Sequence, residues 1–450
     1  MKTTKRILAM VLAVIMVMSL ATTAFAAEGD KYEIFQIFTG DLSGNVLSNV
    51  KWGKNGTGTE GEAVASTVLD ELTAVNNGTD VEQLAVIEKY ANLNTTPYTT
   101  GAAETYTLPN GYYLVRNVAG SQEGEGQFYT LHVVKVVNGT LTIVPKGEAP
   151  EVEKEVDKTD INIGDTVTFT LTATMPSTFE GYETYKVVFH DTMYKGLTFN
   201  EGSVVVNVEG FTTTTGTDAD GNTTITITND NVLDDGVKAG ATITVTYTAT
   251  LNSDAIIGTE GNFNKVKLEY SNNPNTGMEG ETGFTPEDEK KVYTWDMEVL
   301  KYADGDEAKV LEGVKFILLN ADKTKIAKVA DGKIVSWDTY TEGMDVAAYE
   351  LTTDVNGKIS IDGLASGTYY LHETQELPGY NKLTGDVTVT VDNNDDGTYT
   401  TYVAKVNNQS GATLPETGGM GTTMFYIFGA ILMIGAAVLL ITKRRMNMAE

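Results

Sequence analysis

Alternation of threonine with apolar residues at every second position is the feature that most limits how this chain folds. Thr166–Leu171 and Thr242–Tyr247 are examples, and glycine, asparagine and aspartate separate many similar runs. Successive side chains of a strand point to opposite faces, so such runs predict half-buried antiparallel strands. Many short strands with turn residues between them predict a mainly β chain of tandem immunoglobulin-like β-sandwiches.

Length and changes in pattern divide the chain into three domains between two end segments. The 450 residues suit roughly three domains of ordinary size. We expect these domains at 27–147, 148–289 and 290–410, because proline and charged residues mark the joins, as in short linkers. A helical period occurs only in the first domain, over Ala63–Leu72 and Val81–Ala91, and predicts inserted helices packed on its sheet.

The charge balance and the absence of cysteine restrict the class of function. The chain has 61 acidic and 32 basic residues, a formal net charge of -29. Such a surface repels phosphate backbones and predicts no nucleic-acid partner. A hydrophobic content of 41% supports real cores. Without disulfides, an exported chain needs either large cores or another covalent staple.

The N-terminus has the pattern of a secretory signal peptide. A basic start is followed by the apolar run Ile7–Leu20, and Ala24 and Ala26 are the small residues that a signal peptidase reads. We therefore expect residues 1–26 to be removed after Ala26. An uncleaved anchor is the alternative, but the apolar run is short for a membrane span.

The C-terminal segment, 411–450, has the pattern of a membrane anchor. Met424–Ile441 is apolar and about long enough to cross a bilayer. The basic cluster Lys443–Arg445 follows it and predicts a cytoplasmic tail. Taken alone, these two features predict a transmembrane helix and nothing more.

A pentapeptide before this helix changes its interpretation. It consists of Leu414, Pro415, Glu416, Thr417 and Gly418. It resembles the LPxTG cell-wall sorting signal of Gram-positive bacteria, which also precedes an apolar helix and a basic tail. The resemblance implies that a sortase cysteine attacks the carbonyl of Thr417 and releases the chain from Gly418 onward. It further implies covalent attachment to peptidoglycan.

Two sets of polar residues share strand faces with core residues. In the second domain, alternation places Lys154, Asp191 and Asn264 on apolar faces of their strands. In the third domain, Lys301, Glu373 and Asn408 also lie on apolar faces of their strands.

Isolated buried charges are costly, so each set must be paired or neutral. One interpretation is a buried salt bridge, with asparagine only ending a strand. Asn407 is the fallback for Asn408, since it opens the same turn.

The two sets resemble the isopeptide-forming domains of sortase-assembled pilins. The resemblance implies spontaneous Lys154–Asn264 and Lys301–Asn408 amide bonds, assisted by the Asp191 and Glu373 carboxyls. Tyr369–Tyr380 resembles the pilin E-box motif YxLxETxAPxGY of Cna B-type domains, with leucine in place of the usual alanine. We therefore expect Cna-type sandwiches.

Elementary chemistry agrees with these bonds. Burial lowers a lysine pKa and yields a free amine nucleophile, while it raises a carboxyl pKa so that the acid polarises the amide carbonyl. Fixed neighbours supply a high effective concentration.

Polymerisation of such pilins requires an exposed lysine that accepts the sortase-bound acyl group of the next subunit. The family places it in a YPK-like motif at the end of the first domain. The matching stretch here is Leu141–Lys146, in which valine replaces the tyrosine. Lys146 is therefore the candidate polymerisation lysine, and an ordinary linker lysine is the alternative.

Other chemical signals are weak. Two aspartate-rich stretches, around Asp218 and Asp392, lack the spacing of an EF-hand and predict turns. The three histidines show no zinc spacing, and no nucleotide-binding or nucleophile motif occurs. We expect no metal, no cofactor and no enzyme.

Together, the resemblances imply a backbone subunit of a covalent pilus on the Gram-positive cell wall. Its implied partners are sortase, identical pilin subunits and peptidoglycan, with tip or base pilins and host surface ligands as further candidates. The alternative is a monomeric wall-anchored adhesin that binds a host or matrix ligand.

Overall fold

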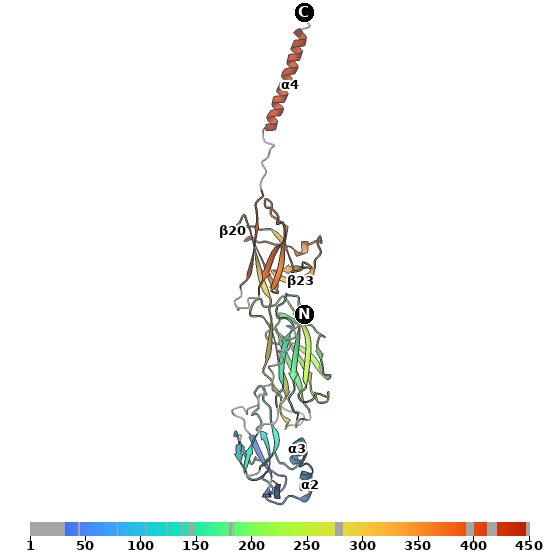
Figure 1. Cartoon of the computed structure of the whole chain (residues 1–450), viewed down its shortest axis with the longest axis vertical. Coiled ribbons are helices and arrows are strands. Elements are labelled where there is room, and N and C mark those ends of the chain that lie inside the picture. The colour runs from blue at the N-terminus through green and yellow to red at the C-terminus, as the bar shows by residue number, and fades with distance from the viewer. Residues whose placement is uncertain are drawn as a thin grey trace, which may run out of the picture.

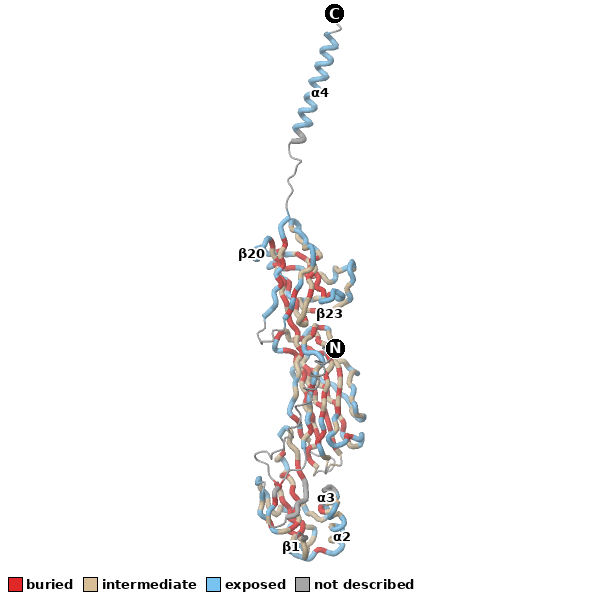
Figure 2. The backbone as a smooth tube through the Cα atoms, in the orientation of Figure 1, coloured by how far each residue is buried: buried red, intermediate tan, exposed pale blue. Residues whose placement is uncertain are grey.

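The computed structural model describes residues 32–446, except 44–45, 79, 104, 123, 137–138, 144–147, 180–181, 183, 275–281, 393–399 and 412–420. The β-domains follow one another along a rod, and helix α4 extends from one end of it (Figure 1). Buried residues follow the strands of each domain, whereas α4 is exposed along its described length (Figure 2). The predicted mainly β fold is confirmed.

The N-terminal part is a sheet covered by two helices. Its strands are β1 (Tyr32–Ser43), β2 (Val46–Trp52), β3 (Thr99–Gly101), β4 (Thr105–Thr107), β5 (Gly111–Asn117), β6 (Leu131–Val136) and β7 (Thr140–Thr142). The main sheet has the order β2-β1-β5-β6, and β4 pairs with β7 apart from it.

The helices of this part lie within a few residues of the predicted stretches. They are α2 (Ser66–Ala74) and α3 (Asp80–Glu88). Leu84 and Ile87 of α3 pack with Phe35 and Phe38 of β1. The helical stripes therefore form one side of a core against the sheet, as predicted.

The middle part is a sandwich of two antiparallel sheets. Its strands are β8 (Glu151–Val156), β9 (Thr166–Thr174), β10 (Val187–Met193), β11 (Leu197–Phe199), β12 (Val205–Val206), β13 (Thr212–Thr217), β14 (Thr223–Asn229), β15 (Thr242–Leu251), β16 (Asn262–Ser271), β17 (Thr282–Phe284) and β18 (Asp288–Val292). One sheet has the order β13-β14-β10-β16-β17 and the other β11-β15-β9-β8. β18 pairs with β16 and so runs past the predicted join at residue 289.

The part of the chain that follows the middle part is one ten-stranded sheet. Its strands are β19 (Trp295–Ala303), β20 (Asp306–Val310), β21 (Lys315–Leu319), β22 (Lys325–Ala330), β23 (Lys333–Thr339), β24 (Leu351–Thr352), β25 (Lys358–Leu364), β26 (Gly367–Gln375), β27 (Val387–Val391) and β28 (Tyr402–Asn408). A short 3-10 helix, η2, covers Ala347–Tyr349. The last strand, β28, pairs in parallel with the first, β19. The chain therefore returns to its starting strand before it leaves the domain.

The middle and following parts share a continuous core. Ile161 and Ile163 lie in the same apolar cluster as Trp295 and Leu364. The Ile163 amide donates to the Gly363 carbonyl at 2.9 Å. Gly363 has a φ of +95°, and a Cβ there would lie 2.5 Å from Ile163. Glycine is required at this position because its backbone is left-handed and the Ile163 side chain fills the space.

Helix α4 (Gly421–Met446) follows the sandwiches. Its segment Met424–Met446 has 23 residues with a mean hydropathy of 2.6, long and apolar enough to cross a membrane. The large apolar side chains of α4 from Met424 onward are exposed, for example Phe425 and Leu432. The predicted C-terminal helix is confirmed in type and place.

Candidate functional site

The middle sandwich brings its three predicted polar residues into one interior. Lys154 comes from β8, at the edge of one sheet, whereas Asp191 and Asn264 come from the adjacent strands β10 and β16 of the other. Lys154 and Asn264 are completely buried, and Asp191 is 1% exposed. The alternation seen in the sequence is the local cause, since it fixes which face each side chain occupies.

A tyrosine hydroxyl joins these three residues. Lys154 Nζ contacts Asp191 Oδ2 and donates to Tyr247 Oη at 2.9 Å. Tyr247 Oη donates in turn to Asp191 Oδ2 at 2.8 Å. Asn264 Nδ2 donates to the same Tyr247 oxygen, also at 2.8 Å. Tyr247 therefore holds the amine and the amide around one point.

Tyr247 was not among the predicted site residues. It lies on β15 and shares its face with the core residues Ile243 and Val245. The signal was available in the sequence, because a buried tyrosine needs a partner for its hydroxyl. The neighbouring threonine pattern predicted the strand but not which polar groups the hydroxyl would meet.

Burial opposes charge on both members of the ion pair. Desolvation lowers the pKa of Lys154, although the neighbouring Asp191 carboxylate opposes this. Desolvation likewise raises the pKa of Asp191, against the influence of Lys154. Both directions favour the neutral amine beside the neutral acid.

Two oxygens of this cluster support the neutral form. Among the described residues, Asp191 Oδ1 and Asn264 Oδ1 are buried without a hydrogen-bond partner. An unpaired acceptor in a core is unfavourable. A proton on the carboxyl would supply the donor that such acceptors lack, and would draw electrons from the amide carbonyl.

The ten-stranded sheet forms the second cluster from two neighbouring strands, β19 and β28, and from β26, which pairs with neither of them. Lys301 lies on β19, Asn408 on β28 and Glu373 on β26. Lys301 Nζ contacts Asn408 Oδ1, and Asn408 Nδ2 donates to Glu373 Oε1 at 2.8 Å. Lys301 Nζ lies 3.3 Å from that same Glu373 oxygen. Each of the three groups therefore contacts the other two.

Lys301 is buried beside an aromatic ring. Its side chain is completely buried, and Nζ lies 5.3 Å from the centre of the Phe316 ring. Burial lowers the pKa of Lys301, and the Glu373 carboxylate opposes the shift. The second oxygen of Glu373 accepts the Leu383 amide at 2.6 Å, which fixes the carboxylate.

The structure distinguishes the two candidate asparagines. In the β19–β28 pairing, Asn408 lies opposite Ala303 and Asn407 opposite Tyr302. The Asn407 side chain turns to the Gly305 amide, whose nitrogen lies 2.9 Å from Oδ1. Asn408 is therefore the residue placed against Lys301, as strand parity predicted.

Family models match three successive stretches of the chain. The Gram-positive pilin backbone subunit 2, Cna-B-like domain, matches residues 163–274. The SpaA prealbumin-like fold domain matches 296–407, and the LPXTG cell wall anchor motif matches 406–447. This chain belongs to the sortase-assembled Gram-positive backbone pilins. The family model describes a backbone subunit, so it favours the pilin over the monomeric adhesin.

A curated protein and solved structures also resemble this chain. The trypsin-resistant surface T6 protein of Streptococcus pyogenes serotype M6 is 24% identical, over 90% of this chain and 90% of its own. The solved T6 backbone pilin of that serotype has a TM-score of 0.50 at 19% identity, covering 81% of this chain and 78% of its own. The full-length major pilin SpaD of Corynebacterium diphtheriae has a TM-score of 0.49 at 18% identity, covering 88% and 93%.

The sorting motif gives the pilin its location. An LPXTG anchor attaches a backbone pilin to the Gram-positive cell wall, where it is a structural subunit of a surface pilus. The pentapeptide Leu414–Gly418, the candidate polymerisation residue Lys146 and the predicted signal peptide 1–26 all lie outside the described residues.

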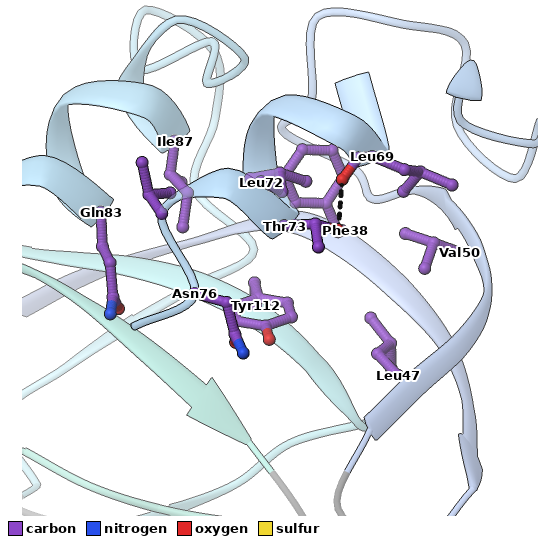
Figure 3. Close-up of a pocket in the computed structure, with 11 residues that line it drawn as sticks. Phe38, Leu47, Val50, Leu69, Leu72, Thr73, Asn76, Gln83, Ile87 and Tyr112 are labelled. Atoms are coloured by element: carbon purple, nitrogen blue, oxygen red, sulfur yellow. Dashed lines mark hydrogen bonds between the residues drawn. The ribbon is translucent and has the colours of Figure 1, made fainter. Parts of the chain in front are cut away.

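Other features of the pilin do not resemble a reaction centre. A cavity of about 350 Å³ lies between α2 and the first sheet, lined mainly by apolar side chains such as Phe38, Leu47 and Leu72 (Figure 3). In the aspartate-rich stretch around Asp218, this side chain accepts the backbone amides of Asp220 and Asn222, as in the predicted turn. The described residues hold no group of three potential metal ligands.

Proposed function

We propose that this pilin forms the pilus shaft by sortase-catalysed linkage of Thr417 to Lys146 of the next subunit. We further propose that the second and third domains each close one internal Lys–Asn isopeptide bond. The observation that supports this most directly is a buried lysine beside an asparagine and a carboxyl group, repeated in two domains. The sorting signal and a rod-shaped body agree with a shaft subunit (Figure 1).

The internal reaction is a condensation that needs no other reactant. The neutral amine of Lys154 or Lys301 attacks the side-chain carbonyl carbon of its asparagine, and a C–N bond forms. The carboxyl group donates a proton to the carbonyl oxygen and accepts the proton that the amine loses. The former amide nitrogen leaves as ammonia, so one amide replaces another with no change of oxidation state.

The assembly reaction exchanges acyl partners in the same balanced way. A sortase cysteine forms a thioester with Thr417 and releases the amine of Gly418. The Lys146 amine of another subunit then attacks the thioester and restores the free cysteine. Lys146 follows β7 and precedes β8, between the first two domains.

The position of the third-domain bond suits a subunit under tension. Pulling force enters through the residues after β28, and Asn408 is the last residue of that strand. A bond to Lys301 would transfer the force directly to β19, because the two strands are neighbours. The other strands of the sheet would then carry little of the load.

Assembly is tested by the substitution Lys146→Arg, which keeps the charge but removes the nucleophilic amine. We expect the wild-type pilin to form a ladder of SDS-resistant species in cell-wall extracts, and the variant to give mainly a wall-attached single subunit. Immunoblots of wall and medium fractions measure both forms. The control is Lys158→Arg, since Lys158 is an exposed lysine just beyond the linker.

Two results would contradict this proposal. A ladder that persists in Lys146→Arg would assign the linkage to another lysine. A single band from the unaltered pilin would reject the covalent shaft itself.

A further inference from the structure

Residues 409–411, just beyond the last strand of the fold, are hydrogen-bonded to Asp304 and to residues 379–381. We call this set of contacts the clamp. The strand β28 ends at Asn408, yet the next three residues remain bound to the domain although they are exposed. The Ser410 amide donates to Asp304 Oδ1 and its hydroxyl to Asp304 Oδ2, both at 2.7 Å. One carboxylate therefore takes both donors of Ser410.

A second segment holds the same three residues from the other side. The Gly411 amide donates to the Gly379 carbonyl at 2.7 Å, and the Asn381 amide donates to Gln409 at 2.9 Å. Tyr380 lies opposite Ser410 in an antiparallel bridge. Residues 409–411 thus lie between Asp304 and the segment 379–381.

The position of Asp304 is itself fixed by its backbone conformation and its hydrogen bonds. Its backbone has a φ of +56°, a left-handed conformation that is uncommon outside glycine and asparagine or aspartate. Its amide donates to the Asn408 carbonyl at 2.9 Å, and Lys309 Nζ contacts its carboxylate. These contacts hold the pKa of the Asp304 carboxyl well below its ordinary value, so it remains an acceptor at any physiological pH.

The clamp lies next to the sorting signal. After Gly411, only Ala412 and Thr413 separate the bound chain from Leu414. The six residues 412–417 span at most about 20 Å even when fully extended. A sortase that reaches Thr417 must therefore work close to this end of the third domain.

We propose that Asp304 is a positioning residue for transpeptidation, which holds Ser410 and thereby sets the reach of the sorting peptide from the pilin body. This inference rests on the proposed function, because reach matters only if sortase uses Thr417. Opening the clamp would free residues 409–411 and lengthen the tether by about 10 Å. If Asp304 only capped the end of β28, its contacts would be unrelated to the length of the tether.

The test combines a shortened tether with an opened clamp. Full-length pilin in detergent is treated with a sortase that accepts LPxTG substrates and with hydroxylamine, and cleavage after Thr417 is followed by mass spectrometry. Deleting Ala412 and Thr413 is expected to slow cleavage at least about tenfold, because the peptide no longer reaches a productive pose. Adding Asp304→Ala to the deletion is expected to restore most of that rate.

Matched variants separate reach from stability. Asp322→Ala removes a comparable exposed turn aspartate, which binds Thr324 and not the C-terminal residues, and should not rescue the deletion. Hydrogen exchange of the Ser410 amide should accelerate about tenfold or more in Asp304→Ala, which requires no sortase.

The outcomes have distinct meanings. Three results would each overturn the role of Asp304. They are normal cleavage of the deletion variant, no rescue of that variant by Asp304→Ala, and an unchanged rate of hydrogen exchange at the Ser410 amide in Asp304→Ala. Rescue by Asp322→Ala would point to general loosening of the domain and would overturn it too. If the unaltered pilin is not cleaved after Thr417, the proposed function fails and this inference fails with it.

Discussion

Replacing Glu373 with glutamine is expected to leave the third domain without its cross-link and to destabilise it strongly. Glutamine fills the same space but cannot take the proton that the Lys301 amine must lose. The intact mass should then exceed that of the cross-linked form by roughly 17 Da, the ammonia that condensation releases. High-resolution mass spectrometry of the purified pilin measures this directly.

The stability effect follows from the length of the closed loop. Lys301 and Asn408 are 107 positions apart. By analogy with a disulfide of that span, the lost bond costs about 4–5 kcal/mol in the free energy of unfolding. For a domain of this size the midpoint of thermal unfolding should fall by roughly 20 °C or more. Calorimetry of the same preparations tests this value.

The matched control for this prediction is Glu376→Gln. Glu376 belongs to the same sequence motif but is not part of the buried cluster. Its variant should retain the cross-linked mass and the wild-type unfolding temperature. A Glu373→Gln pilin that still loses ammonia from the third domain would show that the carboxyl is not needed for the reaction.

The second domain gives the other large expected effect, through Asp191→Asn. The substitution preserves shape but removes the proton acceptor, so the Lys154–Asn264 bond should not form and the mass should again be roughly 17 Da higher. Lys154 would also remain buried without a counter-charge, and removal of one partner of a buried pair costs about 3–5 kcal/mol. Mass spectrometry and chemical denaturation measure the two consequences.

Tyr247→Phe separates positioning from proton transfer in this cluster. The variant keeps Asp191 but removes the hydroxyl that contacts both Lys154 and Asn264. We expect the bond to form more slowly, by about tenfold or more, yet to reach completion. Mass measured at intervals after cell-free synthesis follows the reaction. An unchanged rate would show that the hydroxyl does not position the reacting groups.

The pH dependence of cross-linking has a defined sign. The pKa of Lys154 is lowered and that of Asp191 is raised. The reactive form of the pair therefore has a protonated acid and a neutral amine. The ion pair has the same total number of protons as this neutral pair. A change of pH between the two pKa values of the pair therefore does not change the ratio of the neutral pair to the ion pair. The rate should therefore be flat near neutrality and fall when the pair gains or loses a proton.

The sequence was informative where chemistry depends on local periodicity or on a contiguous motif. Alternation along single strands placed Lys154 and Lys301 among core residues, because neighbouring side chains of a strand must face opposite ways. The pentapeptide ending in Thr417 and Gly418 needed no folded context. Strand parity also favoured Asn408 over Asn407, and the pairing of β28 with β19 agrees with it.

Contacts between distant strands could not be obtained in this way. Tyr247 joins the Lys154–Asp191–Asn264 cluster only because β15 faces β10 and β16 across the sandwich, 56 residues from Asp191. Asp304 meets Ser410 across 106 positions. One strand's alternation contains no information about which residue of another strand lies opposite it.

The sequence by itself therefore determined the class of fold, the route to the cell wall and which lysines point inward. The tertiary structure alone decided which tyrosine joins amine to amide and how the chain is held as it leaves the third domain. The physical reason is that side-chain direction follows from the geometry of one strand, whereas register between strands is set by packing of the whole sandwich.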